Sequence, residues 1–487
     1  MDVEQLKDDA AGGRLSIDRL IDVIASQQRR IDELEKQLKE LKGKSPTERL
    51  DQAYSEKAEQ QRQAKTGRRK RKRKQAGRNK TADKIKQAKR TERVLPAQTR
   101  LDDCSFSHTR VAWRVENGRA VLVAYEIYRC GNRFGKPAGL LGRSEFGIEI
   151  FVAIAYQVYC VGLSIDKACK LLSFFQQLNL KKSQADALLN QLARAWESEF
   201  DSLCTLLAHS AVVHTDETSW SINSVWAFLT DKLTVLFYGV HKDGDTLARI
   251  LDKQTFAGVL ISDDAAVYRD FSKSQKCWAH LIRKAIKLTL QDPESAVYRN
   301  FADRVLEIYR TAKRIKADRR LSDSTRLARV AELDDELLHL CCARWIDDDV
   351  SGGEIENDYR RLCDEIMRLM LNQELFLFVT EPAADGNNNA AERQLRDDAT
   401  ARKTCRTSKT PRGAKRRSVI SSVLQSIGKQ LDRFTLEAVI AEAARWLEEG
   451  ESCFARQVES RGLGPPGTLS YGDETSLLDQ VILAADA

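Results

Sequence analysis

A heptad repeat of apolar residues begins at Ile17 and runs to Leu41. β-Branched residues at the first heptad position with leucine at the fourth favour a parallel two-stranded coiled coil. We therefore predict a coiled coil over residues 14–43 that joins at least two copies of the chain. The alternative is an amphipathic helix packed on the chain's own body. The first positions are Ile17, Ile24, Ile31 and Leu38, and the fourth are Leu20, Leu34 and Leu41, with Gln27 breaking the series.

The pattern then changes from polar to β-like. Residues 44–100 are mostly polar and charged, which predicts a basic, disordered linker that becomes helical only on a partner. Residues 101–143 contain short apolar runs between glycines, which predicts a small β-rich region. Cys104, His108 and Cys130 lie here, but three candidate ligands without paired spacing do not predict a zinc site.

Residues 144–205 have the apolar spacing of helices. The apolar stretch Phe146–Leu163 is interrupted by Glu149 and Gln157, so it predicts a buried helix and not a membrane span. Two short amphipathic helices joined around Asn179–Ser183 are compatible with a helix-turn-helix. Because helix pairs are common in proteins that never read DNA, both interpretations stay open.

Short apolar runs that end in acids distinguish residues 206–291. The run Ala211–Val213 predicts a buried strand that ends at Asp216 and Glu217, and a later strand ends at Asp263. Antiparallel strands first and strands alternating with helices afterwards predict a mixed sheet covered by helices. The expected strands cover residues 211–216, 225–229, 233–240 and 258–262, with a short one closing at Cys277-Trp278, and the expected helices cover 245–251 and 279–290.

The remaining chain is predicted to be helical up to residue 450. Residues 292–380 have helical spacing without recognisable chemistry, which indicates an insertion beside the sheet. Residues 381–450 are expected to complete the core, with a helix opened by Asn387–Arg393 and two more over 419–431 and 436–448. Residues 451–487 form a tail with Gly and Pro and no evident role.

The charge is concentrated in one place. The formal net charge is +8, yet residues 62–93 contain 16 Lys or Arg against two acids, so the remainder is net acidic. A basic run of this kind neutralises DNA phosphates without reading sequence, although a nuclear-localisation signal or a solvated tail has the same composition. The run consists of Arg68, Arg69, Lys70, Arg71, Lys72, Arg73 and Lys74.

Composition and cysteine usage indicate the class and compartment. Hydrophobic residues make up 42% and charged residues 31% of 487 residues, which is typical of a soluble, helix-rich chain of about three domains. The 11 cysteines are scattered without a CxxC pair, and the acidic N-terminus does not resemble a secretory signal. We expect free thiols in a reducing cytoplasm and no membrane partner.

Three carboxylates are the candidate chemistry: Asp216 and Asp263 after strands, and Glu392 on a helix. Phosphodiester chemistry uses two metal ions about 3.5–4 Å apart, and Mg²⁺ prefers oxygen ligands. Each acid also has a structural interpretation. Glu392 fits a capping box with Asn389, Asp263 can open a loop, and Asp216 can be a turn acid.

Three motifs together resemble the insertion-sequence-66 family of bacterial DDE transposases. They are HTDETSW, then GVLISDDAAVY with QKCWAHLIR, then NNAAERQLR with ARK, and the match extends from Phe146 to Leu431. The resemblance implies a ribonuclease-H-like core with a helical insertion, preceded by a coiled coil, a basic linker and a helical DNA-binding region. It implies that Asp216, Asp263 and Glu392 are the catalytic triad and hold two Mg²⁺ or Mn²⁺ ions.

The resemblance also implies the reaction and its partners. The expected activity is cleavage and strand transfer at the ends of an insertion sequence, by a dimer or higher oligomer that acts on element ends and target DNA near the nucleoid. Helper proteins from the same element are a further expectation. Candidate residues along the DNA path are His280, Arg283, Arg393, Arg396 and Lys403.

The sequence departs from the family pattern at three points. Paired CxxC ligands are missing after the linker, Asp264 is a rival to Asp263, and the segment EPAADGN is longer than usual. Two other functions remain open. One is a ribonuclease-H-like nuclease or resolvase that never joins strands, and the other is a catalytically inactive, transposase-derived DNA-binding protein.

Overall fold

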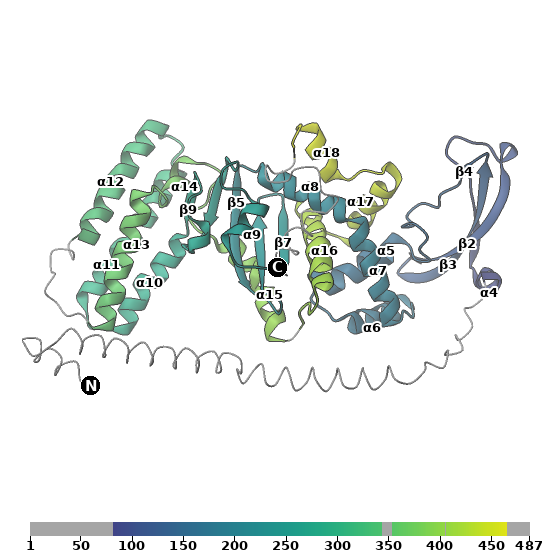
Figure 1. Ribbon diagram of the computed structural model, residues 1–487, viewed down its shortest axis with the longest axis horizontal. Helices are drawn as coiled ribbons and strands as arrows, with labels where there is room; N and C mark the ends of the chain where they lie inside the picture. The colour runs from purple at the N-terminus through teal and green to yellow at the C-terminus, as the bar shows by residue number, and fades with distance from the viewer. Residues whose placement is uncertain (1–80, 343–352, 405, 465–487) are drawn as a thin grey trace, which may run out of the picture. The chain divides into compact units, whose positions relative to one another are not determined.

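The computed structural model describes residues 81–342, 353–404 and 406–464, which form a mixed α/β unit with two mixed sheets (Figure 1). The predicted coiled coil over 14–43 and the basic run over 68–74 lie outside these residues, as does the end of the chain from residue 465. No helix in the described ranges is long and apolar enough to cross a membrane.

The first sheet lies near the start of the described chain. It contains β1 (Arg90–Val94), β2 (Ser105–Glu116), β3 (Arg119–Cys130) and β4 (Arg133–Phe134). β2 and β3 are joined by the two-residue turn Asn117-Gly118, and both residues have positive φ, at 48° and 74°. Asn-Gly adopts this conformation at low cost, so the turn fixes the register of the hairpin.

The linker prediction is wrong for residues 81–94. They form helix α4 (Thr81–Gln87) and strand β1, which pairs in parallel with β3. β1 is a sheet-edge strand with charged side chains, and Arg90 pairs with Glu116 at 2.6 Å. Its stability comes from backbone pairing and ion pairs, so the strand has no apolar alternation that marks it in the sequence.

A helical layer follows and carries much of the main core. It contains α5 (Ile148–Ala155), a π-helical turn (Tyr156–Cys160), α6 (Ile165–Gln176), α7 (Lys182–Ala195) and α8 (Glu197–Ala208). α5 is buried along most of its length, which confirms that the apolar stretch is a buried helix. α6 and α7 are joined through residues 177–181, and their role as a DNA reader stays a prediction.

The second sheet has five strands in the order β7-β6-β5-β8-β9. β5, β6 and β7 are antiparallel, whereas β8 and β9 run parallel to β5. This agrees with the predicted antiparallel start and later alternation with helices. The bounds are β5 Val212–Ser219, β6 Ser224–Leu229, β7 Thr234–Val240, α9 Gly244–Ile250, β8 Val259–Ser262 and β9 Ser274–Lys276.

Helix α16 (Pro411–Gln430) covers the free edge of β7 with serine side chains. Ser418, Ser422 and Ser426 recur every four residues and therefore share one helix face. Their hydroxyls accept hydrogen bonds from N–H groups of β7 at 2.9, 2.9 and 3.0 Å. Gly239 lets the helix approach, because a Cβ there would lie 2.9 Å from Ala414. An edge that would otherwise pair with another chain is thus satisfied within the fold.

The insertion predicted over residues 292–380 is helical and has its own core. α10 (Trp278–Gln291) leads into α11 (Ala296–Ala317), α12 (Asp323–Cys342), α13 (Glu354–Leu371) and α14 (Leu377–Thr380). Val259 and Ile261 of β8 belong to this core, so the insertion packs directly on the sheet. α15 (Asn389–Lys403) then returns the chain to β5 (Figure 1).

The prediction of a tail without a role from residue 451 is wrong at its start. α17 (Leu436–Glu449) is followed by α18 (Cys453–Ser460), which packs against α8. Phe454 is fully buried, with its ring 5.7 Å from that of Trp446. One buried aromatic residue holds this helix, and its short apolar pattern gave no periodic signal.

Replacing Ser422 with alanine tests the helix-to-strand hydrogen bonds. We expect the free energy of unfolding to fall by about 1–3 kcal/mol, because the buried N–H of Leu236 loses its acceptor. Ser421→Ala is the matched control, since that buried hydroxyl has no hydrogen-bond partner in the described chain. Urea denaturation of the full-length protein measures both, and equal losses would contradict this role of the edge contact.

Candidate active site

Asp216 lies inside β5 and not at its end, which corrects the predicted strand boundary. β5 continues to Ser219, and Asp216 pairs with Ala227 of β6. The chain turns only between Ser219 and Ser224, at Asn223, which has a positive φ of 53°. The strand therefore continues beyond Asp216. Alternation along the strand directs Asp216 and Glu217 to opposite faces of the sheet.

The parallel pairing of β5 with β8 brings a second acid to the same level. His214 is opposite Ile261, so Asp263, which follows the end of β8, lies beside the Thr215-Asp216 step. Burial, followed by the charges of Glu217 and Asp263 and last that of Glu392, raises the pKa of Asp216 to about 7. The charges of the other three carboxylates therefore act on Asp216, but the ligand atoms of Asp216, Asp263 and Glu392 do not all lie within 4.8 Å of one another in the described chain.

Glu217 is buried, and its negative charge is balanced by groups on its own face of the sheet. The Tyr268 hydroxyl donates a hydrogen bond to its carboxylate. The Lys242 ammonium group lies 2.5 Å from Glu217 Oε1, and this hydrogen bond is the main cause of the raised pKa of Lys242. The negative charges of Asp263 and Asp216 also raise the pKa of Lys242, so this residue is a positive group beside the candidate site. Nothing in the sequence singles it out, because it is a lone lysine after a strand.

Asp263 and its rival Asp264 have different surroundings. Asp263 Oδ1 accepts a hydrogen bond from the N–H of Ala265 at 3.0 Å, so the residue does open a loop as well as face Asp216. Asp264 forms an ion pair with Arg368 of α13. One acid thus belongs to the carboxylate group on the sheet, and the other fastens the insertion.

Glu392 lies in the first turn of α15, and its carboxylate contacts α10. Arg283 donates to both of its oxygens at 2.8 and 2.9 Å, and His280 Nε2 lies 3.7 Å from Oε1. The alternative of a capping box with Asn389 is wrong, because the N-cap position is Asn388 and has no side-chain capping bond.

Asn388 joins β5, α10 and α15 and was not singled out from the sequence. Its side chain is fully buried, and Nδ2 donates to the carbonyl of Thr215 at 2.7 Å. Oδ1 lies 3.2 Å from Nδ1 of His214, whose pKa burial lowers. The N–H of Asn388 donates to Cys277 Sγ at 3.1 Å. This residue therefore fixes the start of α15 to the strand that carries Asp216.

The predicted DNA-path residues fall into two groups. His280 and Arg283 contact Glu392, whereas Arg393, Arg396 and Lys403 are exposed on α15. None of the three exposed residues forms an ion pair within the described part of the chain. Their spacing places them within one side of the helix, where they are available to an external anion. DNA contact by any of the five stays a prediction.

The donor set around Asp216 fits a hard divalent cation. Asp216, Asp263 and Glu392 are partly buried and offer oxygen ligands only, and the charges of the neighbouring acids help to raise the pKa of Asp216. The group whose ligand atoms do lie within 4.8 Å of one another in the described chain is Cys277, His280 and Glu392, which does not include Asp216 or Asp263. That group suits a hard cation less well, because it includes a thiol whose pKa burial raises. The ion pair between Arg283 and Glu392 restricts both groups, since Glu392 belongs to each.

Residues 143–416 match the family described as Transposase IS66 family. The matched segment is more than half of the 487-residue chain and includes β5 to β9, the insertion and α15. No curated protein matches the chain. The family match confirms the resemblance inferred from the three sequence motifs.

Replacing Asn388 with alanine tests its role in holding the site together. We expect the free energy of unfolding to fall by about 1–3 kcal/mol, because the Thr215 carbonyl stays buried without its donor. Asn389→Ala, at the exposed neighbouring position, is expected to change it by less than about 0.5 kcal/mol. Thermal and urea denaturation of both variants measure the difference, and an unchanged Asn388→Ala protein would refute the role.

Proposed function

Because the chain belongs to the IS66 family of DDE transposases, we propose that it cleaves the ends of an insertion sequence and joins them to target DNA, with Asp216, Asp263 and Glu392 as its catalytic acids. The observation that carries the proposal is the parallel register of β5 and β8, which sets Asp263 beside Asp216. Transposases act on DNA, and DDE transposases as a family use divalent metal ions.

The sheet supports a ribonuclease-H-like core. Three antiparallel strands followed by two parallel strands, in the order β7-β6-β5-β8-β9, put the first strand at the centre. The first acid lies on that central strand and the second follows its parallel neighbour. The third comes from a helix that contacts β5 and β6. Acids on rigid elements keep their geometry better than acids on loops.

Each acid has a distinct task in the proposed mechanism. Asp216 lies on β5 and Asp263 directly follows β8. Glu392, which contacts Arg283 and His280 of α10 in the metal-free protein, is proposed to complete the group from α15 when the ions bind. Divalent ions held there would activate the attacking oxygen and stabilise the leaving one. Mg²⁺ or Mn²⁺ fits the all-oxygen donor set. Lys242 offsets the charge of Glu217, so this buried acid does not compete for the same cation.

Positive groups around the acids hold and orient them. Arg283 and His280 keep Glu392 directed toward α10. Exposed Arg393, Arg396 and Lys403 follow on the same helix and are proposed to contact DNA phosphates. The basic run over 68–74 is proposed to add sequence-independent affinity, and the coiled coil predicted over 14–43, which lies outside the described residues, is proposed to pair two copies of the chain on the two element ends.

Strand cleavage and joining on labelled duplex that carries the element's own ends tests the proposal. In Mg²⁺ or Mn²⁺, we expect Asp216→Asn, Asp263→Asn and Glu392→Gln each to reduce both products by at least about 1,000-fold, since each removes a charged oxygen ligand. Asp264→Asn is the matched control beside Asp263. It is expected to retain activity within about tenfold, because Asp264 pairs with Arg368.

The products separate this function from its rivals. Nicking without joining, lost in all three variants, would indicate a nuclease or resolvase. DNA binding without either product, indifferent to all three substitutions, would indicate an inactive DNA-binding descendant. Loss of activity in Asp264→Asn but not in Asp263→Asn would reassign the second acid.

The pKa of Asp216 predicts how metal binding depends on pH. Its pKa of about 7 exceeds the ordinary value of 3.8, so the folded protein holds a proton that the unfolded chain releases. Metal-free stability should therefore fall as the pH rises from about 4 to 7. Metal needs the carboxylate, so Mn²⁺ affinity at pH 5.5 should be roughly 30-fold weaker than the plateau above pH 7.

Direct titration with Mn²⁺ measures this dependence without DNA or catalysis. Asp216→Asn should bind Mn²⁺ weakly and lose the inflection near pH 7. Asp264→Asn should keep the inflection, since its carboxylate is paired with Arg368. An affinity that is independent of pH between 5.5 and 8 in the unchanged protein would contradict the prediction.

A further inference from the structure

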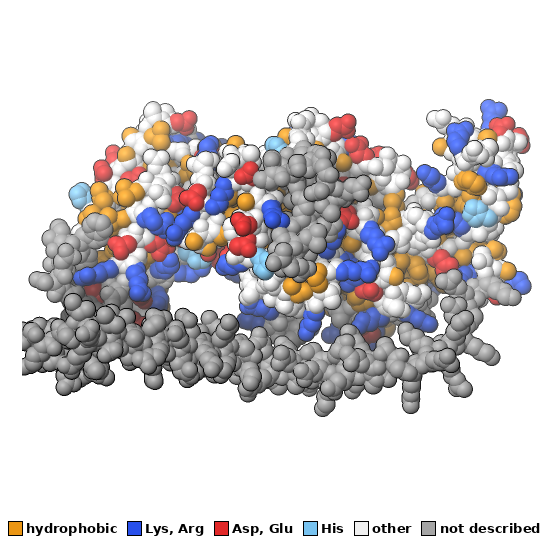
Figure 2. Space-filling model, viewed as in Figure 1, with side chains coloured by type: hydrophobic (Ala, Val, Ile, Leu, Met, Phe, Trp, Pro, Cys, Tyr) orange, Lys and Arg blue, Asp and Glu red, His pale blue; other side chains and the backbone are white. Residues whose placement is uncertain are grey.

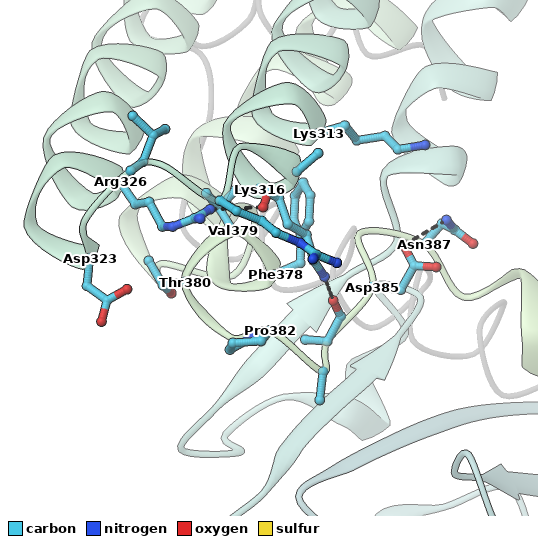
Figure 3. Close-up of a pocket in the computed structure, with 15 residues that line it drawn as sticks. Lys313, Lys316, Asp323, Arg326, Phe378, Val379, Thr380, Pro382, Asp385 and Asn387 are labelled. Carbon is cyan, nitrogen blue, oxygen red and sulfur yellow. Dashed lines mark hydrogen bonds between the residues drawn. The ribbon is translucent and has the colours of Figure 1, made fainter.

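A pocket of about 940 Å³ lies where the end of α11 and the start of α12 meet residues 378–387 (Figure 3). Four cations and two acids line it. Among them, Figure 3 shows Lys316 reaching from α11 toward the segment around Pro382, with Asp385 and Asn387 at the far side. The charged lining residues are Lys313, Lys316, Arg319, Arg326, Asp323 and Asp385.

Two of the four cations have internal partners. Arg326 donates to the carbonyls of Ile315 and Lys316 at 2.7 and 2.9 Å and so caps the end of α11. Lys316 donates to the carbonyl of Ala384, and burial lowers the pKa of Lys316. These two residues therefore build the pocket, because they tie α11 and α12 to the 378–387 segment.

Lys313 and Arg319 differ from the other cations. Both are exposed, and neither forms an ion pair with any acid in the described chain. The internal contact of Lys313 is a cation–π contact, with its ammonium group 5.8 Å from the centroid of the Tyr309 ring. Elsewhere on the insertion, acidic and basic side chains are interspersed (Figure 2), and many are paired, as Arg304 is with Glu336 and Lys284 with Glu365. The pocket lining thus carries a net charge of +2, four cations less two acids, and two of the cations are exposed without an ion pair.

One segment that lines the pocket, residues 378–387, also connects it to the candidate active site. Residues 378–387 lead directly into α15, which carries Glu392. Asn387 lines the pocket, and the next residue, Asn388, is hydrogen-bonded to Thr215 beside Asp216. A chain bound in the pocket would therefore lie next to the segment that positions the catalytic acids.

We propose that this pocket binds the phosphate backbone of a DNA strand whose neighbouring nucleotides occupy the active site, with Lys313 and Arg319 as the phosphate contacts. The inference rests on the proposed function. Phosphate chemistry is shared by DNA and by free phosphate or nucleotides. The volume far exceeds one phosphate, and the direct continuity of residues 378–387 with α15 favours a strand that extends to the active site.

The salt dependence of DNA affinity tests the contacts without catalysis. Full-length protein carrying Lys313→Gln and Arg319→Gln is titrated with element-end DNA in EDTA from about 0.05 to 0.3 M salt. Each lost phosphate contact should lower the slope of log affinity against log salt by about one. Near 0.1 M salt this corresponds to roughly tenfold weaker binding per cation. Arg329→Gln, an exposed α12 arginine outside the pocket lining, is the control for charge alone.

Neutral methylphosphonates placed one by one along the strand locate the contact. In the unchanged protein, substitution at one or two phosphates near the cleavage position should weaken binding, and the double variant should be indifferent at those same phosphates. A slope and affinity equal to those of Arg329→Gln would overturn the inference. So would stabilisation by inorganic phosphate that requires Lys313 and Arg319 without any change in DNA binding.

Binding and catalysis fail in distinguishable ways. If the proposed function is wrong, the triad variants leave the product pattern unchanged, whatever the salt slope shows. If only the pocket assignment is wrong, cleavage and joining remain dependent on the triad and the double variant binds DNA as the Arg329→Gln control does.

Discussion

Negative charge on the central strand of the five-stranded sheet is the constraint on which the site depends. Buried acids are stable only when a cation or hydrogen-bond donors compensate them. The chain supplies Lys242 and Tyr268 to Glu217, Arg368 to Asp264, and Arg283 to Glu392. Within the described residues, no lysine or arginine forms an ion pair with Asp216 or Asp263. These two neighbouring carboxylates therefore have no cationic side chain paired with them in the described chain, which is why the proposed metal site is centred on them.

The framework around the sheet keeps these acids in place at both edges. On the β7 side, the serines of α16 satisfy the strand edge and prevent a sixth strand from adding. On the β9 side, Trp278 donates to the carbonyls of Gly386 and Leu375, which ties the start of α10 to the end of the insertion. The insertion leaves and rejoins the core at nearly one point, so its length does not alter the position of Glu392.

Sequence patterns predicted the strands and helices of the core well where burial is strong and periodic. They predicted the β5–β7 meander, β8 and the helix of Glu392. The three acids as a catalytic set stay a prediction. They missed β1 and α18, because an exposed edge strand and a helix held by Phe454 leave no periodic apolar signal. They also misjudged Asn389, since the polar run 387–389 does not reveal which asparagine turns inward to β5. Partners such as Lys242 and Arg368 depend on tertiary contacts between segments far apart in the chain.

The lysines and arginines of the described chain form two groups, those paired with a carboxylate and those without such a partner. Which group a residue belongs to decides whether it can bind a DNA phosphate. An arginine that already pairs with a partly buried carboxylate is less available to a phosphate, and removing it would leave that acid without its partner. Arg283 and Arg368 therefore belong to the architecture of the site. Other cations are exposed and form no ion pair with a carboxylate in the described chain. They are Arg393 and Arg396 on α15, and Lys313 and Arg319 at the pocket. A basic stretch read only from sequence mixes both kinds, and the contacts of each side chain separate positioning groups from those free to meet DNA.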